Sequence, residues 1–235
     1  MKRINLEPIL KIGILLGFLV FFLKIIISGD INLYVHPRIT PFVIVSVLAL
    51  ALIIIFYIPQ IFKVKTSKRR LVSYLIFIIP LVIGFSMNAQ AMTSNMIKND
   101  NLSISIPGID ASSTSKERVV IENSNFLEFI DDSVENYNKY KSKEIEISGF
   151  VYKDVNYQNN EFAIARFMMT CCSADMKIVG LKCIINNEIT YTNDTWVKAI
   201  GTLELQNING DNVTVLNIRE IEEVNAPKNQ YVYPY

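Results

Sequence analysis

The sequence predicts a membrane protein with an α-helical N-terminal region of three spans and a small all-β outer domain. Three observations predict this fold class. Long apolar runs fill the region before Met92, the two parts of the chain carry opposite charge, and short alternating segments dominate the C-terminal part. We divide the 235 residues into a transmembrane domain (1–92), a polar linker (93–118) and an outer domain (119–235) with a modest core.

The three apolar runs extend over about 9–27, 40–62 and 71–87. Crossing about 30 Å of hydrocarbon at 1.5 Å per residue takes roughly 20 mostly apolar residues, so each run qualifies, the third only just. Lys11 and Lys24 lie near the ends of the first run, where long side chains reach the interface. The alternatives are buried core helices and, for the first run, a signal peptide. Three runs with basic connectors and no A-x-A pattern disfavour both.

The charge distribution predicts the orientation in the membrane. The connector after the second run is strongly basic, and the positive-inside rule places it in the cytoplasm: Lys63, Lys65, Lys68, Arg69 and Arg70. With a cytoplasmic N-terminus, three spans leave the C-terminal domain extracytoplasmic, in a multi-pass protein of the plasma membrane. Residues 1–92 have ten bases and two acids (+8), and the remainder has 13 bases and 20 acids (−7). The acidic domain therefore need not approach the anionic cytoplasmic leaflet.

Residue periodicity predicts the elements of the outer domain. Phe126, Phe129 and Ile130 begin a helical spacing that favours one amphipathic helix over about 124–140. Five short β-like runs follow, at about 144–152, 161–170, 176–185, 196–205 and 213–222. Gly149 suggests a bulge or bend in the first run. This pattern predicts a five-stranded barrel of the OB type, with an open sheet or a small sandwich as the alternative.

Cys171 and Cys172 mark the most distinctive segment outside the apolar runs. Thiolates bind soft or borderline metals such as zinc, and Asp175 adds an oxygen ligand. The alternatives are buried cysteines, a disulfide to Cys183 or between the adjacent pair, and reactive thiols. Arg166 is a candidate orienting charge, with pairing to an acid at the barrel rim as the structural alternative.

His36 is the single histidine of the chain and lies in the loop predicted to be external. An imidazole there is a candidate transition-metal ligand, although a lone histidine is more often an interfacial hydrogen-bonding group. Its place in the membrane part excludes a histidine-assisted nucleophile within the outer domain. No glycine-rich phosphate loop, G-x-S-x-G or H-E-x-x-H motif occurs, so we do not expect an enzyme. The net charge of −7 disfavours nucleic acid as a partner.

Several segments together resemble the YcgQ-like family of bacterial membrane proteins, whose members are described as subunits of two-component permeases. The resemblance covers nearly the whole chain and rests on these residues: Tyr34-x-His36-Pro37-Arg38, Gly149-Phe150-Val151, Arg166 ahead of Cys171-Cys172-x-Ala174-Asp175, Trp196-Val197-x-x-x-Gly201, and the tail Pro227…Pro234-Tyr235. In the family, the residues after the Ala-Asp pair tend to include a proline and a Gly-Val pair. The segment after Asp175 departs from this pattern, because it keeps Gly180 but has no proline.

The resemblance implies pairing with a separate polytopic permease and a connection to metal homeostasis. We therefore expect an accessory or regulatory permease subunit whose outer domain binds or senses a metal or small solute. Two alternatives are an extracytoplasmic thiol redox protein that uses Cys171 and Cys172, and a purely structural membrane-anchored β domain.

Overall fold

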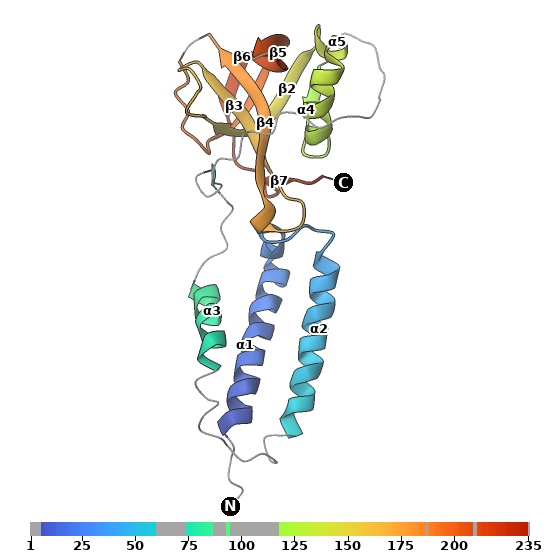
Figure 1. The fold of residues 1–235 in the computed structure, drawn as a ribbon, viewed down its shortest axis with the longest axis vertical. Helices are drawn as coiled ribbons and strands as arrows, with labels where there is room; N and C mark the ends of the chain where they lie inside the picture. The colour runs from blue at the N-terminus through green and yellow to red at the C-terminus, as the bar shows by residue number, and fades with distance from the viewer. Residues whose placement is uncertain are drawn as a thin grey trace, which may run out of the picture. The chain divides into compact units, whose positions relative to one another are not determined.

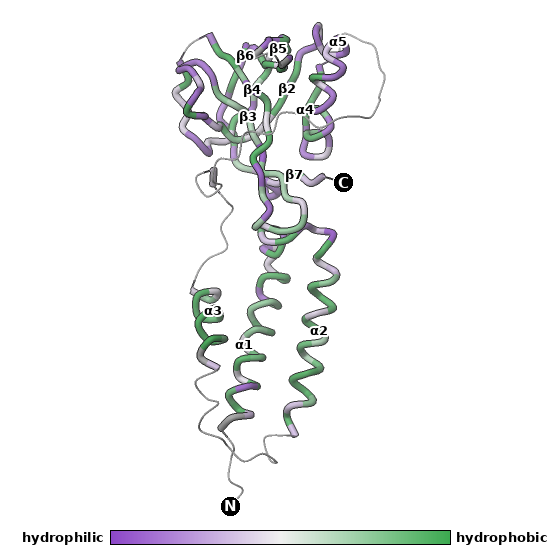
Figure 2. The backbone as a smooth tube through the Cα atoms, in the orientation of Figure 1, coloured by the Kyte–Doolittle hydropathy of each residue, from purple (hydrophilic) through white to green (hydrophobic). Residues whose placement is uncertain are grey.

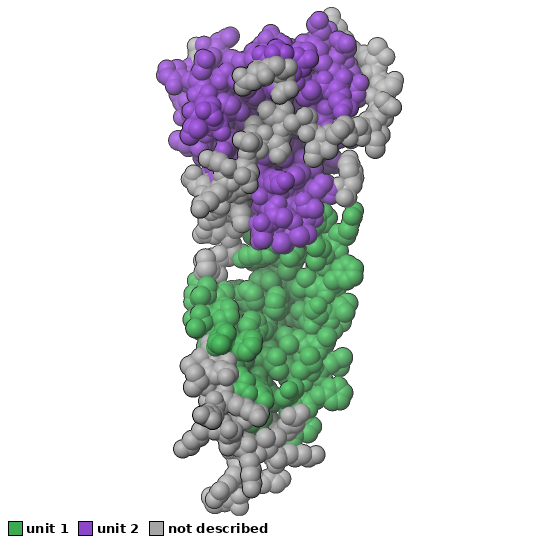
Figure 3. Space-filling model, in the orientation of Figure 1, with its two compact units in different colours: residues 1–91 green, residues 92–235 purple. Residues whose placement is uncertain are grey.

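The structure, a computed structural model, describes residues 6–59, 74–86, 93–94, 118–186, 188–208 and 211–234. They belong to two compact units, 1–91 and 92–235, which are described separately (Figures 1 and 3). Some sequence predictions fall outside the described residues. These are the basic connector at 63–70, most of the linker at 93–118, the two ends of the third apolar run, and Tyr235.

The described part of the first unit contains three apolar α-helices and one short 3-10 helix: α1 (Leu6–Ser28), η1 (Asp30–Leu33), α2 (Thr40–Tyr57) and α3 (Leu75–Ser86). The segments Pro8–Ser28 and Thr40–Tyr57 are long and apolar enough to cross a membrane. Only 6% and 11% of their apolar windows are buried, so neither is the core helix of a water-soluble fold. Figure 2 shows the apolar character along most of each helix, with a few polar positions. Large side chains such as Phe56, 75% exposed, require lipid or another protein as their surroundings.

The described part of the third run, α3, has 12 residues and contains Pro80, so its described length is below that of a full span. It packs on α1 through small residues. A Cβ at Gly17 would lie 2.6 Å from Leu81, and one at Gly84 would lie 3.1 Å from Phe21. Close approach at glycine is typical of helix pairs in membranes, where packing rather than water exclusion holds helices together.

The second unit is an all-β sheet domain with helices on one side (Figure 1). One sheet has the strand order β1-β2-β5-β6-β4-β3-β7, and β2 also pairs with β3, so that five strands form a closed ring of pairings. The strands are β1 (Val119–Ile121), β2 (Glu144–Tyr152), β3 (Glu161–Met168), β4 (Lys177–Ile185), β5 (Trp196–Ile208), β6 (Asp211–Glu223) and β7 (Tyr231–Val232). The pairs within the ring are antiparallel except β4–β6.

The structure confirms the all-β character and differs from the prediction in several details. The strands β1 and β7 were not predicted. β5 continues beyond 205 and β6 begins before 213, so both extend to their hairpin, where Ile208 pairs with Asp211. The predicted single helix is two, α4 (Phe126–Glu135) and α5 (Tyr137–Tyr140), because Asn136 leaves the helical conformation at φ −112° and ψ 41°.

Gly149 is needed for close strand packing rather than for a bulge. The β2–β5 register runs through Gly149 without a shift, and the register shift in the ring lies between Ile200 and Gly201 on β5. A Cβ at Gly149 would lie 2.5 Å from the carbonyl oxygen of Ala165, closer than a side chain tolerates. Just after this point β2 begins to pair with β3 on one edge while it stays paired with β5 on the other through Phe150, which requires the backbones of β2 and β3 to approach closely.

The core of the second unit fills the interior between the sheet and α4. Alternate residues of β2, such as Ile145 and Ile147, are fully buried, in line with the period of two. From α4, Phe126, Phe129 and Ile130 reach the same core, while Glu128 and Asp131 stay on its outer side. This rigid core fixes the positions at which β3 ends and β4 begins.

Candidate functional site

The loop between β3 and β4 holds the two adjacent cysteines in a defined turn. The strand β3 ends at Met168, before the cysteines, and a short 3-10 helix covers Ser173–Asp175. The Asp175 carboxylate accepts hydrogen bonds from the backbone N–H groups of Thr170 (3.0 Å), Cys171 (2.7 Å) and Cys172 (3.4 Å). Asp175 therefore organises the loop, in the manner of a reciprocal helix N-cap.

This turn brings three potential metal ligands together. One ligand atom each from Cys171, Cys172 and Asp175 lies within 4.8 Å of the others. The two sulfur atoms are 3.7 Å apart, which is not a bonded distance. Two thiolates bound to one tetrahedral zinc at about 2.3 Å lie about 3.8 Å apart. The sulfurs are thus already spaced as a shared zinc ion requires. Cys171 is exposed and the other two residues are partly exposed, so further coordination positions face solvent.

The charges around Cys171 disfavour a free thiolate. A hydrogen bond to the Asp175 carboxylate, followed by the neighbouring Cys172, raises the pKa of Cys171 to about 12. Burial opposes ionisation of Asp175, but the hydrogen bonds from Cys171 and the loop N–H groups hold the pKa of Asp175 below its ordinary value. Reactive cysteines need a positive environment supplied by the protein. A bound cation supplies that charge itself, so the loop suits metal binding better than thiol chemistry.

Cys183 does not take part in the cluster. It lies fully buried on β4 opposite Phe162, and its thiol donates to the carbonyl of Leu181 at 3.3 Å. Burial raises the pKa of Cys183 to about 12. All three cysteines are free thiols, so the structure contains neither of the disulfides considered as alternatives. Cys183 behaves as a small apolar core residue.

His36 belongs to the first unit, and the three clustered ligands belong to the second. It lies in the turn between the 3-10 helix Asp30–Leu33 and α2, where its Nδ1 accepts a hydrogen bond from the backbone N–H of Arg38 at 2.9 Å. A neutral imidazole that accepts at Nδ1 carries its proton on Nε2. A metal bound at Nε2 displaces that proton, and a neutral ring then carries its proton on Nδ1. The hydrogen bond from the Arg38 N–H to Nδ1 is therefore lost when His36 binds a metal through Nε2.

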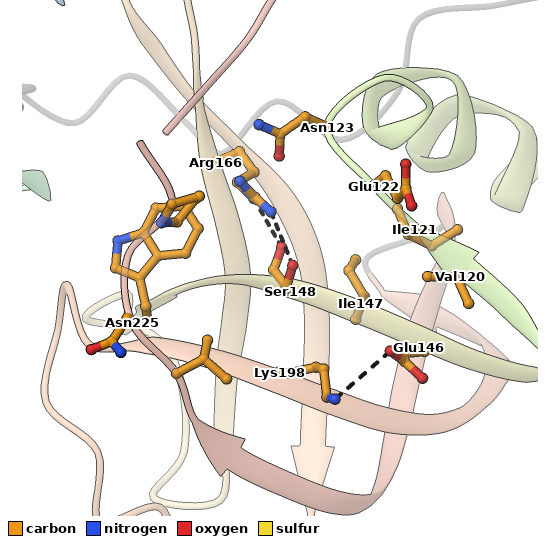
Figure 4. Close-up of a pocket in the computed structure, with 13 residues that line it drawn as sticks. Val120, Ile121, Glu122, Asn123, Glu146, Ile147, Ser148, Arg166, Lys198 and Asn225 are labelled. Carbon is orange, nitrogen blue, oxygen red and sulfur yellow. Dashed lines mark hydrogen bonds and ion pairs between the residues drawn. The ribbon is translucent and has the colours of Figure 1, made fainter. Parts of the chain in front are cut away.

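Arg166 lies on β3 and is only 2% exposed. Its Nε and Nη2 donate to the carbonyl (2.8 Å) and the hydroxyl (3.0 Å) of Ser148 on β2 (Figure 4). Its guanidinium lies 4.6 Å from the ring centre of Trp196 and 5.7 Å from that of Phe126. Among the described residues, no carboxylate forms an ion pair with Arg166, and its Nη1 has no hydrogen-bond partner. Within this part of the chain, the structure therefore gives Arg166 no acidic partner at the rim.

A pocket of about 420 Å³ lies beside Arg166. It is lined by residues from β1, β2, β3, β5 and the segment after β6 (Figure 4). Sequence patterns did not predict this pocket, because residues far apart in the chain meet there only through strand pairing. Ser148 and Trp196 are the residues whose contact with Arg166 was missed. The alternation of β2 predicts which residues of that strand share a face with Ser148, but it does not predict that Ser148 contacts Arg166 on β3.

Two bacterial proteins are similar to parts of this chain. A protein of Streptococcus mutans named "Putative two-component membrane permease complex subunit" is 31% identical over 119 residues, which cover 49% of this chain and 43% of that protein. "UPF0703 protein YcgQ" of Bacillus subtilis is 22% identical over 202 residues, covering 72% of this chain and 70% of that protein. The chain thus aligns with less than half of the length of the first relative.

Family models match both parts of the chain. The DUF1980 N-terminal domain matches residues 10–103, and the DUF1980 C-terminal domain matches residues 97–234, which is more than half of the chain. These matches agree with the YcgQ-like resemblance carried by the double-cysteine segment and the flanking motifs. The chain therefore belongs to the DUF1980 family, with both its N-terminal and its C-terminal domains.

Proposed function

We propose that the protein is the accessory subunit of a membrane permease complex and that its outer domain binds a thiophilic metal ion, zinc above all. The observation that carries the proposal is the convergence of Cys171, Cys172 and Asp175, with a sulfur–sulfur distance of 3.7 Å. Three protein ligands on an exposed loop leave at least one position open. Such a site exchanges its ion, as a receiving or sensing subunit requires, rather than burying it for structural purposes.

We also propose that the chain crosses the membrane three times. It then consists of a transmembrane domain (1–92), a polar linker (93–118) and an outer domain (119–235). The support for three spans is the packing of α3 on α1 through Gly17 and Gly84 and the low burial of all three helices. Lys11 of α1 lies 6.0 Å from the Tyr57 ring and 5.7 Å from the Tyr74 ring. These residues mark the start of α1, the end of α2 and the start of α3, as expected for three antiparallel spans with an interfacial aromatic belt. An odd number of spans and the basic connector favour an extracytoplasmic C-terminal domain.

For the outer domain we propose the OB type of five-stranded barrel. Its support is the ring order β2-β3-β4-β6-β5, closed by β2–β5, with β4 and β6 as its parallel pair. The short strands β1 and β7 then extend the sheet at its edges. The acidic charge of this domain disfavours nucleic acid as a ligand, although many OB barrels bind nucleic acids.

We propose a permease partner because the Streptococcus mutans relative is named as a permease complex subunit and because the helices expose a large apolar surface. The test is purification of the chain from native membranes in mild detergent. A polytopic membrane protein that stays bound in constant proportion supports the subunit assignment. A chain that elutes alone under conditions in which its α-helical content is intact contradicts it.

Metal binding has its own test, with Co²⁺ as a spectroscopic probe of the purified full-length chain. Thiolate ligation gives an intense near-ultraviolet absorption that oxygen ligands do not give. We expect this absorption in the wild type and in Cys183→Ala, and its loss in Cys171→Ser and Cys172→Ser. His36→Ala decides whether the imidazole contributes a ligand. Equal absorption in the wild type and both serine variants would exclude the loop as the site.

A further inference from the structure

The buried cation on β3 needs a negative charge that the described part of the chain does not supply. Burial lowers the pKa of Arg166 to about 10, so the side chain still carries its charge at neutral pH. The two hydrogen bonds that Arg166 donates to Ser148 and the ring faces of Trp196 and Phe126 compensate part of the lost hydration. They do not neutralise the charge, and a buried charge without a counter-ion is costly.

Of the other charged residues of the pocket, Lys198 and Glu146 take part in ion pairs, whereas Glu122 forms none with the described residues. Lys198 pairs with Glu222 at 2.9 Å and lies 3.9 Å from Glu146, and Glu146 also pairs with Arg118 at 3.2 Å. Among the described residues that line the pocket, Arg166 is thus the cation without an ion pair, and it is more deeply buried than Glu122. Because buried charges interact over longer distances than exposed ones, an anion in the pocket gains from Arg166 even without touching Nη1.

The size and the walls of the pocket indicate what kind of anion fits. A volume of about 420 Å³ lies within the range of small-molecule sites. Apolar groups form a large part of the lining and suit a hydrocarbon body: Val120, Ile121, Ile147, Trp196, Val224 and Pro227. Glu122 and Glu146 also line it, and their charges repel a dianion such as phosphate more strongly than a monoanion.

We propose that this pocket binds a small monocarboxylate with a short apolar body, its carboxylate held by the charge of Arg166. Ser148 holds the guanidinium of Arg166 in place by two hydrogen bonds. Trp196 lies against the guanidinium and also forms part of the pocket wall. The site shares no residue with the cysteine cluster and does not depend on metal binding. A domain with both sites responds to an organic anion as well as to a metal ion.

Trp196 provides the assay, because it is the single tryptophan of the chain and contacts Arg166. The full-length protein in detergent is titrated with butanoate at constant ionic strength, and Trp196 fluorescence is recorded. Butylamine and inorganic phosphate serve as comparison solutes. We expect a saturable change with butanoate, no such change with butylamine, and a much weaker one with phosphate.

Two variants make the test specific. Arg166→Gln removes the charge, and we expect butanoate affinity to fall by roughly tenfold or more. Val120→Phe narrows the pocket from an exposed position and leaves Arg166 and Trp196 in place, so it tests the site even where Arg166→Gln fails to fold. We expect it to weaken butanoate binding as well. Unchanged butanoate affinity in either folded variant, no response of the wild type, or an equal response to phosphate would overturn the proposal.

Discussion

Replacing Asp175 by Asn should make Cys171 more reactive while weakening metal binding. The carboxylate of Asp175 is the largest cause of the raised pKa of Cys171, with Cys172 second. A raised pKa means less thiolate at neutral pH. Removing the carboxylate therefore lowers the pKa of Cys171 and increases its thiolate fraction. A site built to activate a cysteine would respond in the opposite way.

The size of the effect follows from the pKa of Cys171, about 12 against an ordinary 9.0. Each pKa unit changes the thiolate fraction about tenfold at a pH well below the pKa. Asp175 accounts for only part of the shift, and a less basic thiolate is intrinsically a weaker nucleophile. We therefore expect Cys171 in Asp175→Asn to be alkylated roughly tenfold to a hundredfold faster at pH 8.

The assay is timed alkylation of the full-length, metal-free protein with iodoacetamide, followed by mass spectrometry of the peptide that contains Cys171. Asp154→Asn is the matched control, because it removes an acid of the same unit that does not contribute to the pKa of Cys171. Cys183 serves as an internal standard for intact folding, since its thiol is fully buried. An alkylation rate of Cys171 in Asp175→Asn equal to or below that of the wild type would refute the reasoning.

Three further predictions concern the cysteine loop between β3 and β4, the junction of α4 and α5, and the close approach of β3 and β4 at Gly180. Zinc affinity should fall steeply as pH is lowered from 8 to 6, because the ligating thiols must lose their protons; competition with a chelator at each pH measures this, and a flat profile excludes thiolate ligation. Burial opposes ionisation of Asp132, but hydrogen bonds from Lys139, Tyr140 and Asn136 hold its pKa below the ordinary value. Its contribution to stability is therefore fully present above about pH 4 and is lost as pH falls through its folded-state pKa. Asp132→Asn should cost about 2–3 kcal/mol at pH 7 and less at low pH, which denaturant unfolding monitored at both pH values can measure; an equal cost at both would show that the charge is unimportant. Gly180→Ala places a Cβ 2.5 Å from the carbonyl oxygen of Ile164 and should destabilise the β domain by about 2 kcal/mol or more, whereas Gly13→Ala, with open space around it, should be neutral. Thermal unfolding compares the two, and equal melting temperatures would contradict the observed strand spacing.

The all-β character and the loop could be predicted because both depend on local sequence. Alternation in the first part of β2 follows directly from the period of two, and the predicted β-like run at 161–170 ends just before the cysteine pair. The boundary of the helix was missed at Asn136, where the side-chain contacts of Asp132 with α5 outweigh helical periodicity.

The missed features depend on contacts between distant segments. The strands β1 and β7 have three and two residues, too few for a periodic pattern, and they form only because β2 and β3 offer free edges. The contacts of Arg166 with Ser148 and Trp196 join β3 to β2 and to the start of β5. Their separations in the chain follow from the order of the strands in the sheet, which periodicity does not specify.

Thiol labelling on intact cells tests the central claim most directly, because it reports the location of the loop and its metal binding together. Cells that express the full chain are treated with a membrane-impermeant maleimide, with and without added zinc, and each cysteine is scored by mass spectrometry. The account predicts labelling of Cys171 and Cys172 from outside, protection of both by zinc, and no labelling of Cys183 in either case. Labelling that requires permeabilised cells, or that zinc leaves unchanged, would contradict it.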